Sequence, residues 1–218
     1  MSGVVSRPPS AGYGWQAGGT PHSCSYIVPK VIEVLTRLKP QRVLDIGAGS
    51  GALCAEMTRY FPQVVGLEPD AQGAELARRV APAARILQLG VETDGASLRQ
   101  TEGTFDAVVS TEVIEHLYAP HLLPALAAQV LVPGGHLVLT TPYHGYLKNL
   151  ALSIAGKWDH HHTALWCGGH VKFWSRATLT HLLDQQGFDV VEFLGVGRAP
   201  YLWKSMVMVA RKRDMAAT

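Results

Sequence analysis

Apolar residues recur along the chain in two alternating patterns. Continuous apolar runs of strand length lie at 42–46, 64–67, 84–89, 105–110 and 136–140. Between them, apolar residues return every three or four positions, as they do on one face of a helix, over 52–60, 71–80, 95–99 and 121–130. Strand and helix in regular alternation predict a parallel sheet with right-handed crossovers and helices on both faces.

Further elements are predicted before and after this alternating block. Helical spacing precedes the first run over 29–38, with Pro29 suited to the first turn. The last third is predicted to contain helix 146–157, loop 159–169, helix 175–186 and strands 190–194 and 205–210. Because a short loop rather than a helix joins the last two strands, we expect the sheet to finish antiparallel. The predicted fold is an α/β, Rossmann-like three-layer α/β/α sandwich with a seven-stranded, mostly parallel sheet and an antiparallel last strand.

The length and composition fit one domain. A chain of 218 residues, 47% of them hydrophobic, fills one sizeable core. Residues 1–22 are rich in Gly, Pro and Ser, so we interpret them as a flexible arm that orders when something binds. Residues 23–218 form the single predicted domain, in which 146–174 is an inserted helix and loop placed to act as a substrate lid.

The charge balance and the cysteines exclude several classes of protein. With 19 basic and 17 acidic residues the net charge is +2, which does not indicate a nucleic-acid partner. Cys24, Cys54 and Cys167 form no CxxC pair, so neither a disulfide framework nor a zinc ribbon is expected. No signal peptide and no apolar run of roughly 20 residues is found. We therefore expect a cytoplasmic protein.

The sharpest local signal is a glycine loop. The first strand runs into Gly47-Ala48-Gly49-Ser50-Gly51 and then a helix, so that the backbone turns tightly and approaches a ligand closely. A dinucleotide site separates its last two glycines by two residues, whereas one separates them here. Asp45 would repel a pyrophosphate and receive an amino group. S-adenosyl-L-methionine offers an amino group, a carboxylate and a nucleoside, so we expect it to bind at Asp45, Gly47, Ala48, Gly49 and Gly51.

The ends of the next strands complete the predicted cofactor site. Glu68 follows the second strand, where a carboxylate can accept both ribose hydroxyls, although the same geometry serves a nicotinamide cofactor. Residues after the third strand are expected to contact the adenine edge of the cofactor. Residues at the end of the fourth strand are expected to lie under its methionine part. The residues expected there are Glu68, Pro69, Gly90, Val91, Ser110 and Thr111.

These motifs carry a family resemblance. The segments VLDIGAGSG at 43–51, EPD at 68–70, FDAVVSTEVIEHL at 105–117 and LVPGG at 131–135 resemble the successive motifs of class I S-adenosylmethionine-dependent methyltransferases over roughly 25–145. Together with TTP at 140–142 and GHVKFW at 169–174, EVIEHL resembles the ubiquinone-biosynthesis type of small-molecule O-methyltransferase. The resemblance implies methyl transfer to a hydroxyl of a small-molecule substrate, such as an aromatic or isoprenoid compound, with S-adenosyl-L-homocysteine as product.

Histidines are the candidate catalytic residues. Transfer from a sulfonium mainly requires alignment of donor and acceptor, and a base of near-neutral pKa assists a hydroxyl acceptor. Ligands of open α/β sheets lie over the carboxyl ends of the strands, a position that favours His144 and His170. His116 is interpreted as a packing and hydrogen-bonding residue. Glu112 and Glu115 are explained by the dipole at a helix start.

No metal site is expected from the sequence. The consecutive residues His160, His161 and His162 do not easily converge on one ion, and no Asp or Asn constellation suited to Mg²⁺ is visible. We interpret the three histidines as part of a surface or lid loop.

The helix predicted at 146–157 leaves three roles open. Leu147, Leu150, Ala151 and Ile154 share one face, so the helix can be a lid, a peripheral membrane contact through 146–158, or an element buried against the domain.

Alternatives of function also remain. They are an N-methyltransferase, a donor-binding module without catalysis and a nicotinamide-dependent reductase, the last disfavoured by the glycine spacing and Asp45. The oligomeric state is not indicated.

Overall fold

The computed structural model describes residues 23–162 and 169–214. The arm predicted at 1–22 lies outside these residues, as does Cys167. In the described part, no helix has both the length and the apolar character that crossing a bilayer requires.

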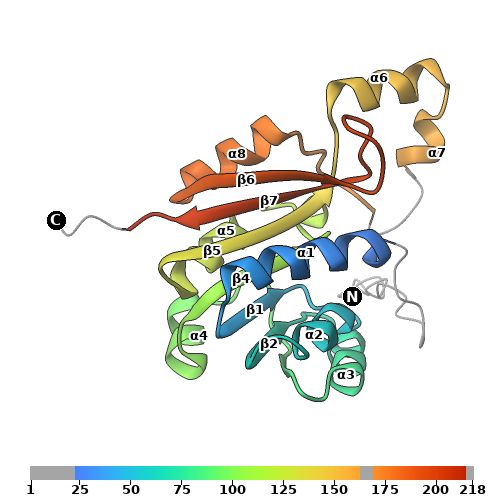
Figure 1. Ribbon diagram of the computed structural model, residues 1–218. Helices are drawn as coiled ribbons and strands as arrows, with labels where there is room; N and C mark the ends of the chain where they lie inside the picture. Colours follow the sequence, from blue (N-terminus) through green and yellow to red (C-terminus); the bar gives the residue numbers. More distant parts are fainter. Residues whose placement is uncertain (1–22, 163–168, 215–218) are drawn as a thin grey trace, which may run out of the picture.

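A single seven-stranded sheet forms the centre of the structure (Figure 1). Its order is β3-β2-β1-β4-β5-β7-β6, and only β7 is antiparallel to its neighbours. The strands are β1 (Arg42–Ile46), β2 (Gln63–Leu67), β3 (Arg85–Leu87), β4 (Phe105–Thr111), β5 (Leu131–Pro142), β6 (Phe188–Val196) and β7 (Ser205–Lys212). The predicted mostly parallel sheet with an antiparallel last strand is confirmed.

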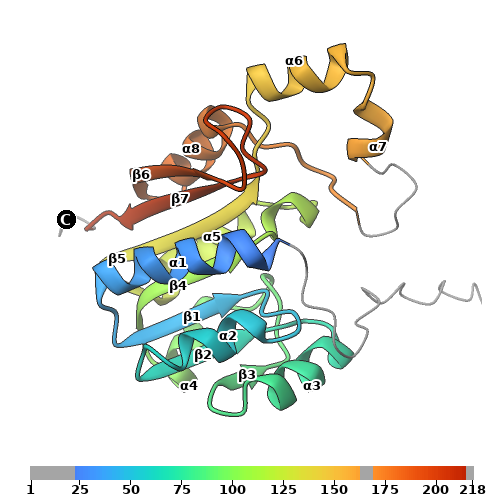
Figure 2. The same cartoon turned by 45° about the vertical axis from the view of Figure 1, so that its right-hand side comes forward.

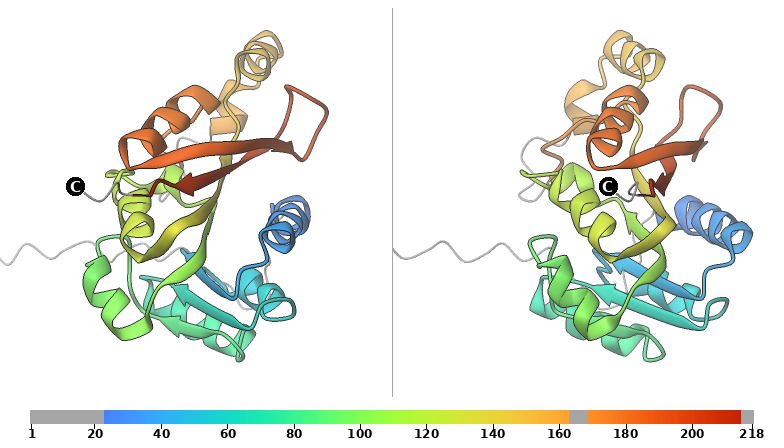
Figure 3. Two further views of the ribbon diagram at one scale, coloured as in Figure 1. Left: turned by 60° about the vertical axis from the view of Figure 1, so that its left-hand side comes forward. Right: turned by 90° about the vertical axis from the view of Figure 1, so that its left-hand side faces the viewer.

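Helices cover both faces of the sheet, which makes three layers. Figure 3 shows α1 and α2 on one side of the sheet and α4, α5 and α8 on the other. The helices are α1 (Cys24–Leu38), α2 (Ala52–Met57), α3 (Ala71–Val80), α4 (Gly95–Glu102), α5 (Leu122–Val130), α6 (Tyr146–Ile154), α7 (Trp158–His162) and α8 (Arg176–Gln185), with a short 3₁₀ turn, η1 (Ile114–His116). α6 and α7 project away from the sheet (Figures 1 and 2).

Each central strand is buried on both faces. Along β1, Val43 packs into the cluster under α1, α2 and α3, and Leu44 into the cluster under α4, α5 and α8. Successive side chains of a strand point to opposite faces, so a parallel sheet covered on both sides consists of nearly continuous apolar runs. This is why the strands were predictable as uninterrupted hydrophobic segments.

The structure corrects several predicted boundaries. α1 begins at Cys24 rather than at Pro29, because Ile27 is buried at 2% exposure and continues the apolar face of the helix. β5 begins at Leu131 because this residue pairs with Phe105, across a register shift in β4. The predicted loop at 159–169 is wrong in its first part, which belongs to α7.

The glycine loop takes a conformation that only glycine adopts without strain. Gly51 has φ +82°, and a Cβ atom there would lie 2.7 Å from the backbone Cα of Ala77 on α3. Gly47 has φ +87°, and a Cβ atom there would overlap the side chain of Val113 even more closely. The loop therefore requires glycine both for its backbone angle and for the close approach of its neighbours.

We expect Gly51→Ala to lower the free energy of unfolding by about 3 kcal/mol or more, because a left-handed backbone and a backbone clash combine. Gly187→Ala is the matched control, since Gly187 has the same φ of +82° with nothing within 4 Å of the added Cβ. That variant should lose only about 1 kcal/mol. Urea unfolding of both variants measures the difference, and equal losses would contradict the steric explanation.

Candidate functional site

The predicted site residues gather at one edge of the sheet. Parallel strands β1, β2, β4 and β5 all end there, and the glycine loop, the segment after β2, η1 and the segment leading to α6 follow these ends. Ligands of open α/β sheets bind outside this carboxyl edge. The edge is therefore the candidate site.

Asp45 is a buried carboxylate at the end of β1. It is 1% exposed, and its Oδ2 accepts a hydrogen bond from the Cys54 thiol at 3.3 Å. Oδ1 has no hydrogen-bond partner among the residues that the structure describes. Burial, and then repulsion from Glu68, raises the pKa of Asp45 to about 7, against a lowering effect of the thiol. A buried, unsatisfied carboxylate oxygen is costly unless a ligand satisfies it.

Glu68 ties the glycine loop to the end of β2. Its Oε2 accepts the N–H of Gly49 and its Oε1 the N–H of Asp70, each at 2.9 Å. The N–H groups of Gly47 and Ala48 in turn donate to the carbonyl of Leu67. Burial is the main cause that raises the pKa of Glu68. Main-chain and carboxylate bonds thus hold the loop in place.

The remaining predicted cofactor residues lie along the same edge but differ in exposure. Val91 is buried, Gly90 and Thr111 are half-buried, and Pro69 is exposed. Ser110 is also buried, and its hydroxyl donates to the carbonyl of Ile46 at 2.7 Å. The Ser110 side chain therefore holds β4 to the end of β1.

Glu112 occupies a strained position directly after β4. Its φ is +54°, which is uncommon for a residue other than glycine. Its carboxylate accepts hydrogen bonds from Thr140 and from Ser205 on β7. Burial raises the pKa of Glu112 to about 7. The predicted explanation for Glu112 and Glu115, a helix dipole, is wrong, because only the short η1 follows and both side chains turn into the protein.

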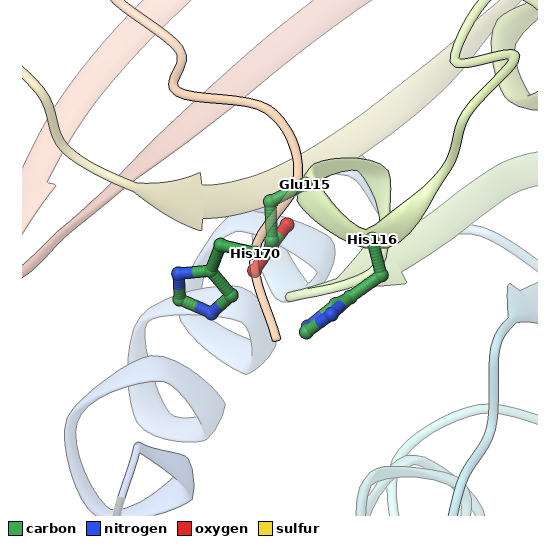
Figure 4. Close-up of side chains that lie close together, drawn as sticks. All are labelled: Glu115, His116 and His170. Atoms are coloured by element: carbon green, nitrogen blue, oxygen red, sulfur yellow. The ribbon is translucent and has the colours of Figure 1, made fainter. Parts of the chain in front are cut away.

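Glu115, His116 and His170 form a cluster of metal-ligand type (Figure 4). One ligand atom from each residue lies within 4.8 Å of the others. Glu115 is 1% exposed, and Thr141 donates to its Oε2 at 3.0 Å, while Oε1 has no partner in the described part of the chain. Burial and repulsion from Glu112 raise the pKa of Glu115 well above its ordinary value.

Backbone hydrogen bonds bring this cluster together. The N–H groups of Val171 and Lys172 both donate to the carbonyl of Glu115, at 2.9 and 3.0 Å. His116 Nδ1 lies 3.2 Å from the carbonyl of Gly169. A carbonyl only accepts, so Nδ1 carries the proton and Nε2 carries the lone pair that a metal ion requires. His116, assigned to packing from the sequence, belongs to this cluster.

His144 lies among aromatic rings. It is 9% exposed, and its ring is stacked on His162 at 5.8 Å and contacts Phe173 edge-on at 5.1 Å. Burial lowers the pKa of His144 to about 3 and that of His170 to about 4. A base works best when its pKa is near the operating pH, so both rings are better suited to neutral hydrogen bonding or metal ligation than to proton abstraction.

α6 has its apolar face outward and its lysine inward. Tyr146 and Ile154 are 78% and 79% exposed, whereas Lys148 is 5% exposed. The Lys148 ammonium donates to the carbonyl of Tyr143 at 2.7 Å, and burial lowers its pKa to about 8. Burial of the apolar face against the domain, one of the three roles left open, is therefore excluded.

Three parts of the candidate site were not predicted from the sequence. Lys148 lies outside the apolar face predicted for its helix and had no predicted role, and Cys54 was considered only as one of three cysteines without a CxxC pair. The metal-type cluster joins His170 to residues more than 50 positions earlier, so no local spacing marks it. In the sequence, only the adjacent pair Glu115 and His116 could have indicated this cluster.

Comparisons with known proteins identify the family of this chain. A family model described as a methyltransferase domain matches residues 23–193. The ubiquinone biosynthesis O-methyltransferase of Bradyrhizobium sp. (strain ORS 278) is 31% identical over 172 residues, which cover 77% of this chain and 66% of that protein. The human mitochondrial protein of the same name is 31% identical over 166 residues, covering 73% and 44%. The match spans about half to two thirds of these relatives' length.

Solved structures share the fold. Magnesium protoporphyrin IX methyltransferase from Synechocystis PCC 6803, with bound S-adenosylhomocysteine, has a TM-score of 0.64 and 17% identity, covering 85% of this chain and 81% of that one. The 1,6-didemethyltoxoflavin-N1-methyltransferase of Burkholderia thailandensis has a TM-score of 0.62 and 22% identity, covering 85% and 77%. With the family model matching most of its length, this chain belongs to the methyltransferase domain family.

Proposed function

We propose that this protein transfers the methyl group of S-adenosyl-L-methionine to a hydroxyl group of a small molecule. The observation that carries the proposal is Asp45, a buried carboxylate just before the glycine loop, one oxygen of which has no hydrogen-bond partner among the described residues. An anion at this place rejects a pyrophosphate and attracts an ammonium group. The donor has such a group, and a nicotinamide cofactor does not.

The donor site follows from the residues around Asp45. Glu68, at the end of β2, is placed to accept hydrogen bonds from ribose hydroxyls, while it keeps the loop in place through Gly49. Gly47, Ala48 and Gly51 let the backbone approach the ligand. The other predicted members of the site, with the roles given above, are Pro69, Gly90, Val91, Ser110 and Thr111.

The acceptor side is formed by Glu115, His116, His170 and His144. The first three fit a divalent cation, because one carboxylate and two neutral imidazoles are a ligand set of Zn²⁺ and related metals. Bound by these three residues, such an ion would lower the pKa of an acceptor hydroxyl and fix its position. His144 contributes a neutral ring beside Phe173, which suits contact with a planar acceptor. No metal was expected from the sequence, and this proposal replaces that expectation.

The relatives support a hydroxyl acceptor over the alternatives. The relatives cited are named ubiquinone biosynthesis O-methyltransferases, whereas two structural neighbours, at 22% and 15% identity, are named N-methyltransferases. An oxygen-binding cation beside the acceptor favours oxygen as the nucleophile. Cys24 and Cys54 are free thiols, which supports the cytoplasm as the compartment.

We also propose that α6 rests on a membrane surface. Its apolar residues Tyr146, Leu147, Leu150 and Ile154 are exposed, while Lys148 anchors the helix from inside. An apolar helix face at the entrance of the site suits an acceptor that partitions into lipid. The proposed partners are thus a small-molecule substrate and a lipid surface, without nucleic acid.

We expect S-adenosylhomocysteine to bind with micromolar affinity in isothermal calorimetry at pH 8, and NADH and NADPH not to bind. Asp45→Asn should weaken binding at least tenfold, or about 1.4 kcal/mol. Because folding raises the pKa of Asp45 from 3.8 to about 7, its ionisation lowers the stability as the pH rises from about 4 to 7, and the full loss persists above pH 7. The neutral amide of Asp45→Asn avoids this loss. The variant should therefore remain folded at pH 8.

Asp189→Asn is the control and should bind normally. Asp189 is an exposed carboxylate near the start of β6, at the end of the strand away from the candidate site. Unchanged affinity of Asp45→Asn would contradict the proposed donor site. Release of labelled product from a panel of phenols and other hydroxylated compounds then separates an enzyme from a binding module.

We expect the chelator-treated protein to bind one equivalent of Zn²⁺ or Mn²⁺, with a rise in melting temperature. Glu115→Gln should weaken metal binding at least tenfold, because it removes the anionic ligand. His121→Asn, at an exposed histidine before α5, is the control. Metal content by mass spectrometry and calorimetric titration measure the effect without any turnover, and equal binding by Glu115→Gln would exclude this site.

We expect the protein to co-sediment with phosphatidylglycerol vesicles. The combined replacement of Leu147, Leu150 and Ile154 by Ser should reduce the bound fraction about tenfold, because each loses its apolar contact with lipid. Val191→Ser, at a residue 56% exposed on the edge strand β6, is the control. Equal sedimentation of the triple variant and the control would refute a membrane role for α6.

A further inference from the structure

Cys54 is the side chain in direct contact with the carboxylate assigned to donor binding. It is 0% exposed and lies in the first turn of α2, immediately after the glycine loop. Its Sγ donates to Asp45 Oδ2 at 3.3 Å. Asp45 precedes the loop and Cys54 follows it, so this hydrogen bond links the two ends of the loop.

The surroundings leave room for a thiol and little more. Gly66 of β2 pairs with Asp45 in the sheet, and a Cβ atom on Gly66 would lie 3.0 Å from the Cys54 sulfur. The absence of a side chain at Gly66 thus creates the space that the thiol fills. The contact between sulfur and carboxylate is enclosed between β1, β2 and α2.

Among the residues that the structure describes, no cation is one of the groups that shift the pKa of Asp45. The titratable groups that act on it are Cys54 from α2 and Glu68 after β2. Cys24 from α1 is acted on by Asp45, which raises the pKa of this thiol. Burial and Glu68 favour the protonated carboxyl group, and the thiol hydrogen bond favours the ionised one. Of the two groups that act on Asp45, Cys54 alone stabilises the form that an ammonium group requires.

We propose that Cys54 is a positioning residue that holds Asp45 by Oδ2 with Oδ1 turned toward the donor, and that donor binding is coupled to loss of a proton from Asp45. The proton passes from the carboxyl group to the buffer, and the ammonium group of the donor replaces it as the partner of Oδ1. The inference rests on the proposed function, since it requires the donor to bind at Asp45.

The coupling has a definite sign. With a pKa of about 7, Asp45 is mostly protonated below neutral pH. A cationic ligand then has to displace the proton, so its affinity falls by up to about tenfold for each pH unit below 7 and levels off above it. Removal of the thiol donor raises the pKa of Asp45 further, and the whole affinity curve moves to higher pH.

The test is calorimetry with S-adenosylhomocysteine from pH 5.5 to 8.5, in pairs of buffers with different ionisation enthalpies. The wild-type protein should bind about tenfold more weakly at pH 6 than at pH 8 and release protons on binding. Cys54→Ala should bind about three to ten times more weakly than wild type at pH 6.5 and converge with it at pH 8.5, since a thiol is a weak donor.

Cys54→Ser keeps a hydrogen-bond donor and should restore the wild-type curve. Met57→Leu alters the same buried face of α2 without touching the thiol and should follow wild type. A Cys54→Ala curve identical to wild type, or lowered equally at every pH, overturns the inference, because the latter is the signature of a merely structural role. Wild-type binding that is independent of pH also overturns it, while no binding at pH 8.5 overturns the proposed function itself.

Discussion

Burial of acidic side chains at one edge of an otherwise apolar sheet is the constraint that governs this structure. Asp45, Glu68 and Glu115 are each 5% exposed or less, and Glu112 lies among them. Both faces of the sheet are covered, so the strand ends are the place where polar groups of the core can meet ligands. Burial is the largest cause that raises the pKa of all four carboxyl groups. Repulsion from Glu68 adds to it at Asp45, and repulsion from Glu112 adds to it at Glu115. Such an edge attracts cations.

The proposed ligands share this positive charge. The methyl donor carries an ammonium and a sulfonium group, and the Glu115 cluster suits a divalent metal ion. Local hydrogen bonds stabilise the buried carboxylates. Cys54 donates to Asp45, the N–H of Gly49 donates to Glu68, and Thr141 donates to Glu115. Oδ1 of Asp45 and Oε1 of Glu115 receive none from the described residues. These two oxygens mark the donor side and the acceptor side of the site.

Lys148 connects the site to α6. Its ammonium is attracted by Glu112 and donates to the carbonyl of Tyr143, where β5 leads into α6. A helix attached through a buried lysine leaves its apolar side chains outside, the reverse of an ordinary surface helix. The same residue therefore adds a cation to the acidic edge and orients the apolar face that we assign to a membrane.

The sequence by itself determined the fold class, the glycine loop and most of the residues at the strand ends. Buried parallel strands are continuous apolar runs, and the glycines are fixed by backbone angles that other residues adopt only with strain, as at Gly51. Both signals depend on neighbouring residues in the chain, so they can be recognised in the sequence alone.

Only the tertiary structure decided how distant side chains combine. His170 reaches Glu115 through backbone bonds from Val171 and Lys172, and Cys54 reaches Asp45 across the glycine loop. The roles of Glu112 and Lys148 were missed because burial, rather than position in a helix, sets their charge and partners. Local periodicity reports which face of an element is apolar, whereas contact between separate elements depends on how the whole core packs.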